Sequence, residues 1–419
     1  MMHAEQLGSR HGRLDWWRTI AAMAVAVLIL VAATPAQAQT YTILHNFTGY
    51  GDGGDPWAPL TMDAAGNFYG TTQLGGSAGY GVVFKLSHQG AGWILSTLYT
   101  FQGGEDGAYP LGGVTLGPDG SLYGTTNAGG VGCNPEGCGT VFKLRPSAAV
   151  CRAASCPWTE TVLYRFTGGS DGAYPSLENL IFDQAGNLYG TTAQGGINRQ
   201  GLVFELIPSN GHWTENVLYR FTGNGDGLIP AGGVTFDNAG NLYGTCAYSS
   251  GGGGTVYELS PSGAGWTEKT LHSFVQSQND GFEPSGGVVI DAQGNLYGTT
   301  EYGGYYQQGT AYQLSPSNGN WNFTLLHSFE GNEGPGDTPT LDAAGNVYGT
   351  SQYSGGDGLV FELSPYNGGW NYSNLHVFDY SDGYLPYASV IFDRQGNLYG
   401  TTSEGGSDFA GVIFEITPN

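Results

Sequence analysis

Charged side chains are scarce in this 419-residue chain, and positively charged ones are the scarcest. Charged residues make up 11% of the sequence, with 12 Lys and Arg against 35 Asp and Glu, which gives a net charge of −23. Lysine occurs only at positions 85, 143 and 269. So acidic a chain repels nucleic-acid phosphates and anionic lipid surfaces, and we expect neither as a partner.

Beyond residue 39, hydrophobic residues do not recur with the 3.6-residue period of an amphipathic helix over any sustained stretch. This part of the sequence also has no apolar run long enough to span a bilayer. No G-x-S-x-G, H-E-x-x-H, P-loop or Rossmann motif occurs, so we predict no catalytic residue and no dedicated metal site. The chain has instead 74 glycines and 13% aromatic residues. This composition is typical of short strands joined by tight turns.

The first 38 residues have the pattern of a signal peptide. Arg10, Arg13 and Arg18 precede an apolar run at 20–33, and Ala36-Gln37-Ala38 is an A-x-A cleavage site. We therefore expect cleavage after Ala38, with an uncleaved anchor as the alternative. The remaining 39–419 should form a single domain without membrane insertion, secreted or periplasmic.

One seven-letter string recurs throughout the mature chain. GNLYGTT stands at 186–192, 294–300 and 396–402, and close variants stand at 66–72, 120–126, 240–246 and 345–351. The successive copies are 54, 66, 54, 54, 51 and 51 residues apart. A period near 50 is typical of a four-stranded propeller blade, and in copy three we predict strands at 176–183, 187–192, 201–206 and 213–221. We assign the string to packing between blades.

The two ends of the mature chain predict how the ring closes. Residues 41–47 (YTILHNF) match the fourth strand of the repeat, whereas the last copy supplies only the first three strands. Together they complete one shared blade, which leaves no free edge. We therefore predict an all-β, seven-bladed β-propeller, with a β-solenoid as the alternative. The fourth strands carry Tyr or His at one position, and we assign the histidines to packing or to satisfied surface positions, not to metal binding.

A second motif, D-G-x-x-P, lies in the loops between successive repeats and is expected to share one face with the loops after GNLYGTT. Each Asp suits a turn that its own side chain stabilises, and Gly331 replaces it in copy six. Collectively, these acids and nearby aromatics predict a ligand-binding face at the central channel, whose oxygens also suit Ca²⁺. The predicted residues are Asp52, Asp55, Trp57, Asp106, Tyr109, Asp171, Tyr174, Arg199, Asp226, Asp280, Phe282, Tyr305, Tyr306, Asp382 and Tyr384.

Four of the five cysteines fall in an insert that accounts for the 66-residue step. Cys133 and Cys138 precede the third strand of blade two, and Cys151 and Cys156 follow it. That strand, 139–144, separates the two pairs by about 20 Å at about 3.3 Å per residue. We therefore predict disulfides Cys133–Cys138 and Cys151–Cys156, which is consistent with an exported protein.

Motifs recur in a fixed order along the chain: G-N-L-Y-G-T-T, then G-G, then G-x-V-F-E-L-x-P, then W, and then L-Y-x-F. In these motifs, residues 41–418 resemble the GloVer (Gloeo_Verruco) tandem repeat. The resemblance implies an exported bacterial repeat protein and assigns no residue a function. We expect a monomeric, non-catalytic propeller that binds an extracellular glycan, peptide or protein and needs no cofactor. The alternatives are a polysaccharide hydrolase or lyase, and a structural envelope protein.

Overall fold

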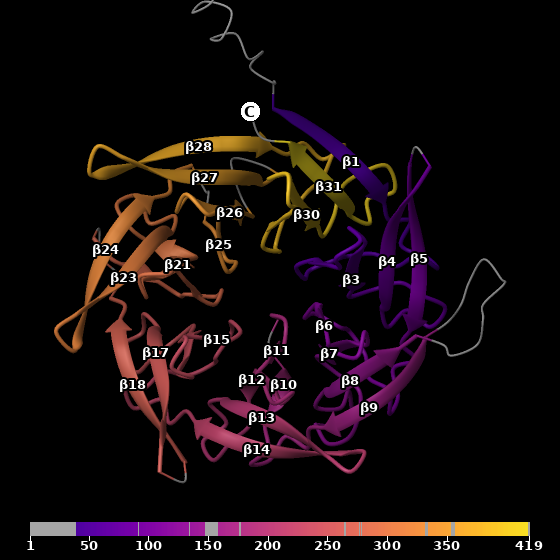
Figure 1. The fold of residues 1–419 in the computed structure, drawn as a ribbon, viewed down its shortest axis with the longest axis horizontal. Helices are drawn as coiled ribbons and strands as arrows, with labels where there is room; N and C mark the ends of the chain where they lie inside the picture. Colours follow the sequence, from indigo (N-terminus) through magenta and orange to yellow (C-terminus); the bar gives the residue numbers. More distant parts are fainter. Residues whose placement is uncertain are drawn as a thin grey trace, which may run out of the picture. The chain divides into compact units, whose positions relative to one another are not determined.

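Seven four-stranded antiparallel sheets surround a central axis, and together they form a β-propeller (Figure 1). The structure is a computed structural model that describes residues 39–90, 92–133, 135–146, 158–175, 177–263, 265–275, 277, 279–331, 334–352 and 357–417. Residues 41–417 form one compact unit. The predicted fold class is confirmed, whereas the predicted signal peptide lies outside the described residues.

Each blade consists of four strands, A to D, from the axis outward. The A strands are Thr61–Met62 (β2), Val114–Leu116 (β6), Ile181–Phe182 (β11), Thr235–Phe236 (β15), Val289–Ile290 (β20), Thr340–Leu341 (β25) and Ile391–Phe392 (β29). The B strands are Phe68–Thr72 (β3), Leu122–Thr126 (β7), Leu188–Gln194 (β12), Leu242–Cys246 (β16), Leu296–Thr300 (β21), Val347–Ser351 (β26) and Leu398–Thr402 (β30).

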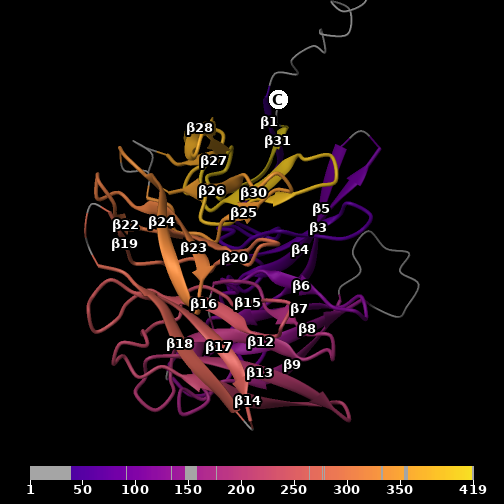
Figure 2. The ribbon, with the colours of Figure 1, turned by 60° about the vertical axis from the view of Figure 1, so that its left-hand side comes forward.

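The longer C and D strands lie side by side at the periphery, as β17 and β18 show (Figure 2). The C strands are Val82–Gln89 (β4), Thr140–Arg145 (β8), Leu202–Ser209 (β13), Thr255–Ser262 (β17), Thr310–Ser317 (β23), Leu359–Tyr366 (β27) and Val412–Thr417 (β31). The D strands are Gly92–Thr100 (β5), Thr159–Arg165 (β9), His212–Arg220 (β14), Gly265–Ser273 (β18), Asn320–Ser328 (β24), Gly369–Val377 (β28) and Thr40–Asn46 (β1).

The ring closes as predicted, because β1 pairs with β31 in the sheet β1-β31-β30-β29. The A strands are shorter than predicted: in blade three β11 covers only residues 181–182 of the expected 176–183. The Leu180 carbonyl, directly before β11, accepts a hydrogen bond from the Thr115 hydroxyl of blade two.

The GNLYGTT string has a separate structural role at each polar position. In blade three, the Asn187 amide and the Tyr189 hydroxyl both donate to Asp183, at 2.8 and 3.1 Å. The first threonine, Thr191, donates to the Gly232 carbonyl of the next blade at 3.0 Å. The second, Thr192, donates to the Gln194 carbonyl of its own loop at 2.9 Å. The string therefore closes a turn, joins two blades and fixes the loop that follows.

The apolar positions of the string are buried between sheets. Leu188 is fully buried, and a side chain in place of Gly190 would meet Leu180 and Phe204 at 2.7 and 2.8 Å. Tyr rings of the B strands contact Trp rings of the next blade, as in the Tyr123–Trp213 pair with centroids 6.1 Å apart. These contacts support the assignment of the string to packing.

The D-to-A segments and the B-to-C loops share one face in six blades. Two short strand pairs contribute, Ala173–Pro175 (β10) with β12 and Gly281–Phe282 (β19) with Tyr302–Gly303 (β22). The same pairing occurs at four isolated bridges, Gly54 with Leu74, Ala108 with Ala128, Leu228 with Tyr248, and Tyr384 with Glu404. Among the described residues, no helix is long and apolar enough to cross a bilayer.

Candidate binding cavity

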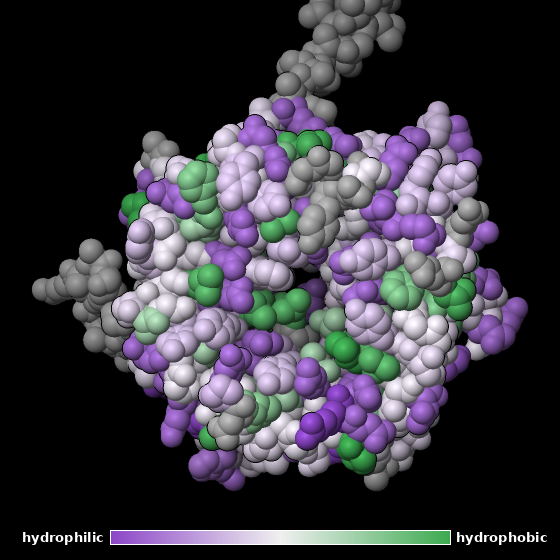
Figure 3. Space-filling view, turned by 180° about the vertical axis from the view of Figure 1, so that it is seen from behind, coloured by the Kyte–Doolittle hydropathy of each residue, from purple (hydrophilic) through white to green (hydrophobic). Residues whose placement is uncertain are grey.

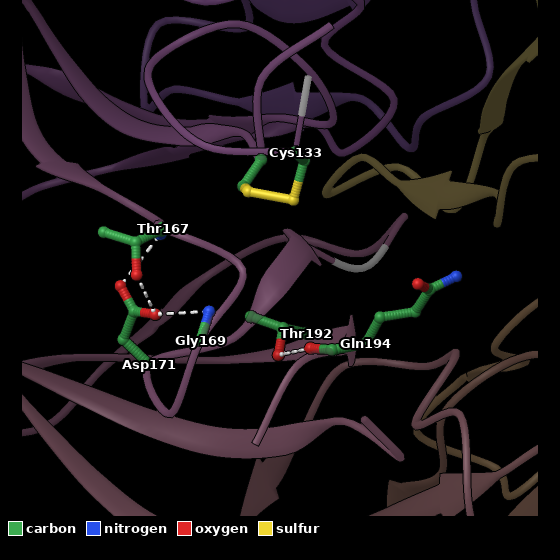
Figure 4. Close-up of a disulfide and its surroundings, with 7 residues drawn as sticks. Cys133, Thr167, Gly169, Asp171, Thr192 and Gln194 are labelled. Carbon is green, nitrogen blue, oxygen red and sulfur yellow. Dashed lines mark hydrogen bonds between the residues drawn. A yellow bond between two sulfur atoms is a disulfide. The ribbon is translucent and has the colours of Figure 1, made fainter. Parts of the chain in front are cut away.

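The aspartates of the D-G-x-x-P motif hold their own loops in shape. Asp171 accepts hydrogen bonds from the Thr167 amide at 2.9 Å, the Thr167 hydroxyl at 2.7 Å and the Gly169 amide at 3.2 Å (Figure 4). The other five also accept backbone amides: Asp52 from Thr48, Asp106 from Gln102, Asp226 from Thr222, Asp280 from Val275 and Asp382 from Asp379. This is the turn-forming role that the short Asp side chain suits.

In six of the seven D strands, the Tyr or His is a second partner of the same aspartate. Tyr164 donates to Asp171 at 3.2 Å, and the His272 ring nitrogen lies 3.0 Å from Asp280. The remaining pairs are Tyr99–Asp106, Tyr219–Asp226, His45–Asp52 and His376–Asp382. In the described chain no three metal-ligating side chains of His, Cys, Asp or Glu come together. These histidines serve the turns.

The connection from blade five to blade six lacks this arrangement. Gly331 occupies the Asp position, and Nε2 of His327 is buried without a hydrogen-bond partner. Burial lowers the pKa of His327 to about 4, with Glu330 opposing the shift. The exception shows that the Tyr and His position depends on the turn aspartate for its polar contact.

A cavity of about 410 Å³ lies among the inner segments of six blades. The D-to-A segments of blades one, three, four, five, six and seven contribute to its wall, as do the B-to-C loops that begin with Ala247, Glu301 and Gln352. The space-filling view shows the ring hollowed at its centre, with hydrophobic residues bordering the depression (Figure 3). Most of the wall therefore comes from positions outside both repeated motifs.

An aromatic pair forms one part of this wall. The rings of Trp57 and Tyr387 stack with centroids 4.0 Å apart and planes 6° apart. The Trp57 indole donates to Asp55 at 2.7 Å. Burial raises the pKa of Asp55 to about 6, the Trp57 hydrogen bond opposes this, and the charge of Glu404 adds to it. A carboxyl with that pKa exchanges its proton near neutral pH.

Asp55 also has an unusual backbone. Asp55 directly precedes Pro56, and its own φ angle is 61°. This value lies in the left-handed region, which residues other than glycine rarely adopt. The equivalent residues share this conformation: Tyr109, Tyr174, Ile229, Glu283 and Leu385, with φ of 53–61°. Such strain persists only where surrounding structure enforces it, and here the enforced segment leads directly into the cavity wall.

Four carboxyl groups line the cavity. Glu283 accepts a hydrogen bond from Tyr248, and the Ser285 hydroxyl donates to Glu301 at 3.2 Å. Glu178 of blade three accepts from Thr338 of blade six at 2.6 Å, across 160 residues of sequence. The fourth is Asp337, and burial raises the pKa of Asp337, Glu178 and Glu283.

The structure separates the predicted site residues into several places. Trp57 lines the cavity and Asp55 is bonded to it. Tyr174 and Arg199 line another hollow of about 310 Å³, whose wall includes Cys133 of the disulfide. Tyr305 and Tyr306 form an exposed pair with centroids 4.9 Å apart. Phe282 packs against Tyr302, Tyr384 against Tyr380, and Tyr109 against Tyr80.

The predicted Cys133–Cys138 disulfide is confirmed. The predicted Cys151–Cys156 pair lies outside the described residues. The fifth cysteine, Cys246, is buried, and burial raises the pKa of its thiol. It stands where most other B strands have their second threonine.

Sequence reasoning missed Glu178, Tyr248, Glu301 and Gln352, all of which line the cavity. Glu178 had a signal in the sequence. Between Pro175 and Asp183 blade three has one residue more than its counterparts, and Glu178 stands near positions that are Gly-Gly at 112–113, 232–233 and 286–287.

Fold and cavity together define a seven-bladed propeller with an acidic and aromatic central site. The family model of the Gloeobacter/Verrucomicrobia repeat matches residues 29–252, 139–355 and 237–419, and the chain belongs to that family. No curated protein matches the chain.

Solved structures resemble the fold at low sequence identity. The extracellular domain assigned to a one-component system of B. thetaiotaomicron is 11% identical, with a TM-score of 0.53 over 90% of this chain and 40% of that one. This chain thus spans less than half of that protein. A Thermus thermophilus protein assigned as an oxidoreductase (glucose dehydrogenase) is 15% identical, with a TM-score of 0.45 over 91% of this chain and 100% of the other. A Xanthomonas campestris gluconolactonase is 15% identical, with a TM-score of 0.38 over 61% of this chain and 74% of the other. The likeness concerns the fold alone.

Proposed function

We propose that this protein is an exported, non-catalytic propeller that binds the end of an extracellular glycan in its central cavity. Export is supported by the signal-like sequence of residues 1–38 and by the Cys133–Cys138 disulfide, since disulfides persist in oxidising compartments. A solved structure of similar fold is likewise an extracellular domain.

The observation that carries the proposal is the stacked Trp57–Tyr387 pair in a wall otherwise rich in carboxyl groups. A flat aromatic surface suits the apolar face of a sugar ring, and carboxylates accept hydrogen bonds from its hydroxyls. A volume of about 410 Å³ falls within the range of small-ligand sites and suits one or two sugar rings.

Calorimetric titration of the mature chain with a panel of soluble glycan oligomers tests the proposal. Replacing Trp57 by Ala should weaken binding by about tenfold or more, because truncating a buried aromatic contact removes one of the main binding contributions. Tyr366→Ala is the matched control, because Tyr366 is 60% exposed and lies on the β27–β28 hairpin. Unchanged affinity in Trp57→Ala would move the site away from the cavity.

Hydrolysis of the bound glycan is the second candidate, because four carboxyl groups line the cavity and Asp55 is hydrogen-bonded to Trp57 in its wall. A general acid must hold a proton near the working pH, as the pKa of about 6 at Asp55 permits. A reducing-end assay on the glycans that bind separates the candidates. Release of product that Asp55→Asn abolishes would replace the binding role by a hydrolytic one.

A further inference from the structure

The wall of the cavity is charged with one sign only. Among the described residues that line it there are four carboxyl groups and no Lys, Arg or His. The chain offers few cations in any case, with 12 Lys and Arg in 419 residues. The protein supplies no positively charged side chain to these four carboxyl groups within the cavity wall, so a cationic ligand can supply the opposite charge.

The propeller does not need two of these acids. Blades two, four and five have Gly-Gly where the inner segment passes the axis, whereas blade three has Glu178-Asn179 and blade six has Asp337-Thr338. The neighbouring glycines make room for them. A Cβ at Gly233 would lie 2.9 Å from Glu178, and one at Gly286 would lie 2.2 Å from the Asp337 backbone.

Asp337 is only 4% exposed and has an unmet acceptor. Its Oδ2 accepts from the Thr350 amide at 3.3 Å and the Thr350 hydroxyl at 3.2 Å, whereas Oδ1 has no hydrogen-bond partner. Burial and the nearby Glu178 charge raise its pKa. A buried carboxyl is unfavourable without a donor, so a ligand that donates to it restores the missing contact.

An ammonium group fits this arrangement better than a metal ion does. Calcium takes six to eight oxygens converging on one point, and in the described chain no three His, Cys, Asp or Glu side chains converge in this way. The carboxyl groups are instead spread around the cavity. Such a distribution suits an organic cation with several N–H donors, and an aromatic face attracts the same charge.

We infer that the cavity selects an amino sugar whose free ammonium group is bound by Asp337 and Glu178 while the sugar ring packs on the aromatic pair. This inference rests on the proposed function, because it names the class of glycan for the same site.

The test compares β-1,4-linked oligomers of glucosamine, N-acetylglucosamine and glucose by calorimetry, with the mature chain at 0.15 M and 0.5 M salt. The glucosamine oligomer should bind about tenfold or more tightly, and the preference should persist at high salt because the carboxyl groups are buried. Its binding near pH 6 should also release protons, measured in two buffers of different ionisation enthalpy, since a cation favours the ionised carboxyls.

Asp337→Asn and Glu178→Gln should each remove most of this preference, because each variant should lower the affinity for the glucosamine oligomer far more than the affinity for the glucose oligomer. Glu136→Gln removes the same charge at an exposed loop and should change nothing. Circular dichroism confirms folding, and either cavity variant suffices if the other misfolds. Equal binding of all three oligomers, or a preference kept in both variants, overturns the inference while leaving a glycan-binding cavity intact. No binding of any oligomer overturns the proposed function as well.

Discussion

The carboxylates of the D-G-x-x-P turns and those of the central cavity differ in what satisfies them. Each turn aspartate accepts an amide of its own loop, and its Tyr or His partner comes from the D strand of the same repeat. The cavity acids Asp337 and Glu178 come from two different blades, and Asp337 keeps an acceptor without a donor. An acid that recurs with the repeat thus supports the fold, whereas the two acids that we infer to bind a ligand break the repeat.

The largest expected effect is the loss of a turn aspartate. Asp226→Ala should lower the free energy of unfolding by about 2–3 kcal/mol, because the Thr222 amide and the Tyr219 hydroxyl both lose a charged acceptor. Urea unfolding followed by tryptophan fluorescence measures this. Asp408→Ala, at an exposed aspartate that binds only the Ser407 hydroxyl, should change stability by less than about 0.5 kcal/mol. Equal losses in the two variants would remove the distinction.

A cavity aspartate should behave in the opposite way. Because the folded pKa of Asp337 is raised, its contribution to stability is full below the ordinary Asp pKa and is lost as pH rises through the raised value. Asp337→Asn cannot ionise and should be about 1–2 kcal/mol more stable than the unaltered chain at pH 8. Urea unfolding from pH 5 to pH 8 should show the difference growing with pH. A variant less stable at every pH would count against a ligand-directed role.

His327 of β24, the D strand of blade five, tests the same contrast. Its folded pKa of about 4 lies below the ordinary value of 6.5, so its contribution to stability is present above pH 6.5 and is lost as pH falls toward 4. His327→Phe keeps the stack on Tyr372 and should be about 1 kcal/mol more stable than the unaltered chain at pH 4.5. The matched His272→Phe loses the Asp280 contact and should be destabilised at pH 7. If His327→Phe is no more stable than the unaltered chain at pH 4.5, another group stabilises the protonated His327 ring and the prediction is wrong.

The smallest effect concerns the second threonine of GNLYGTT. Thr192→Val removes the hydrogen bond to the Gln194 carbonyl and should lower the free energy of unfolding by about 1 kcal/mol. Ser351 occupies the same position in blade six, and its hydroxyl has no partner. Ser351→Ala should therefore be close to neutral by thermal unfolding, and a loss as large as that of Thr192→Val would contradict the assignment.

The fold could be predicted because its signals are repeated seven times. Strand spacing and the match of residues 41–47 to a D strand are properties of the chain order, and β1 pairs with β31 accordingly. The cavity could be predicted only in part. Trp57 was found because it is aromatic and near a motif, whereas Glu178 and Glu301 approach the axis only because blades far apart in sequence converge there. An acidic residue that occurs in only one repeat does not form a recurring motif, so repeat analysis does not single it out.

The pairing of β1 with β31 also sets the order in which the molecule can be made. Among the described strands, β1 comes first in the chain and its partner β31, residues 412–417, comes last. Until they pair, both the first and the last blade present unpaired strand edges, which are prone to pair with other chains. Closure joins segments about 370 residues apart, the kind of contact that slows folding most. Until β31 pairs with β1, the blades can form only an open arc, and its two edges stay exposed to other chains.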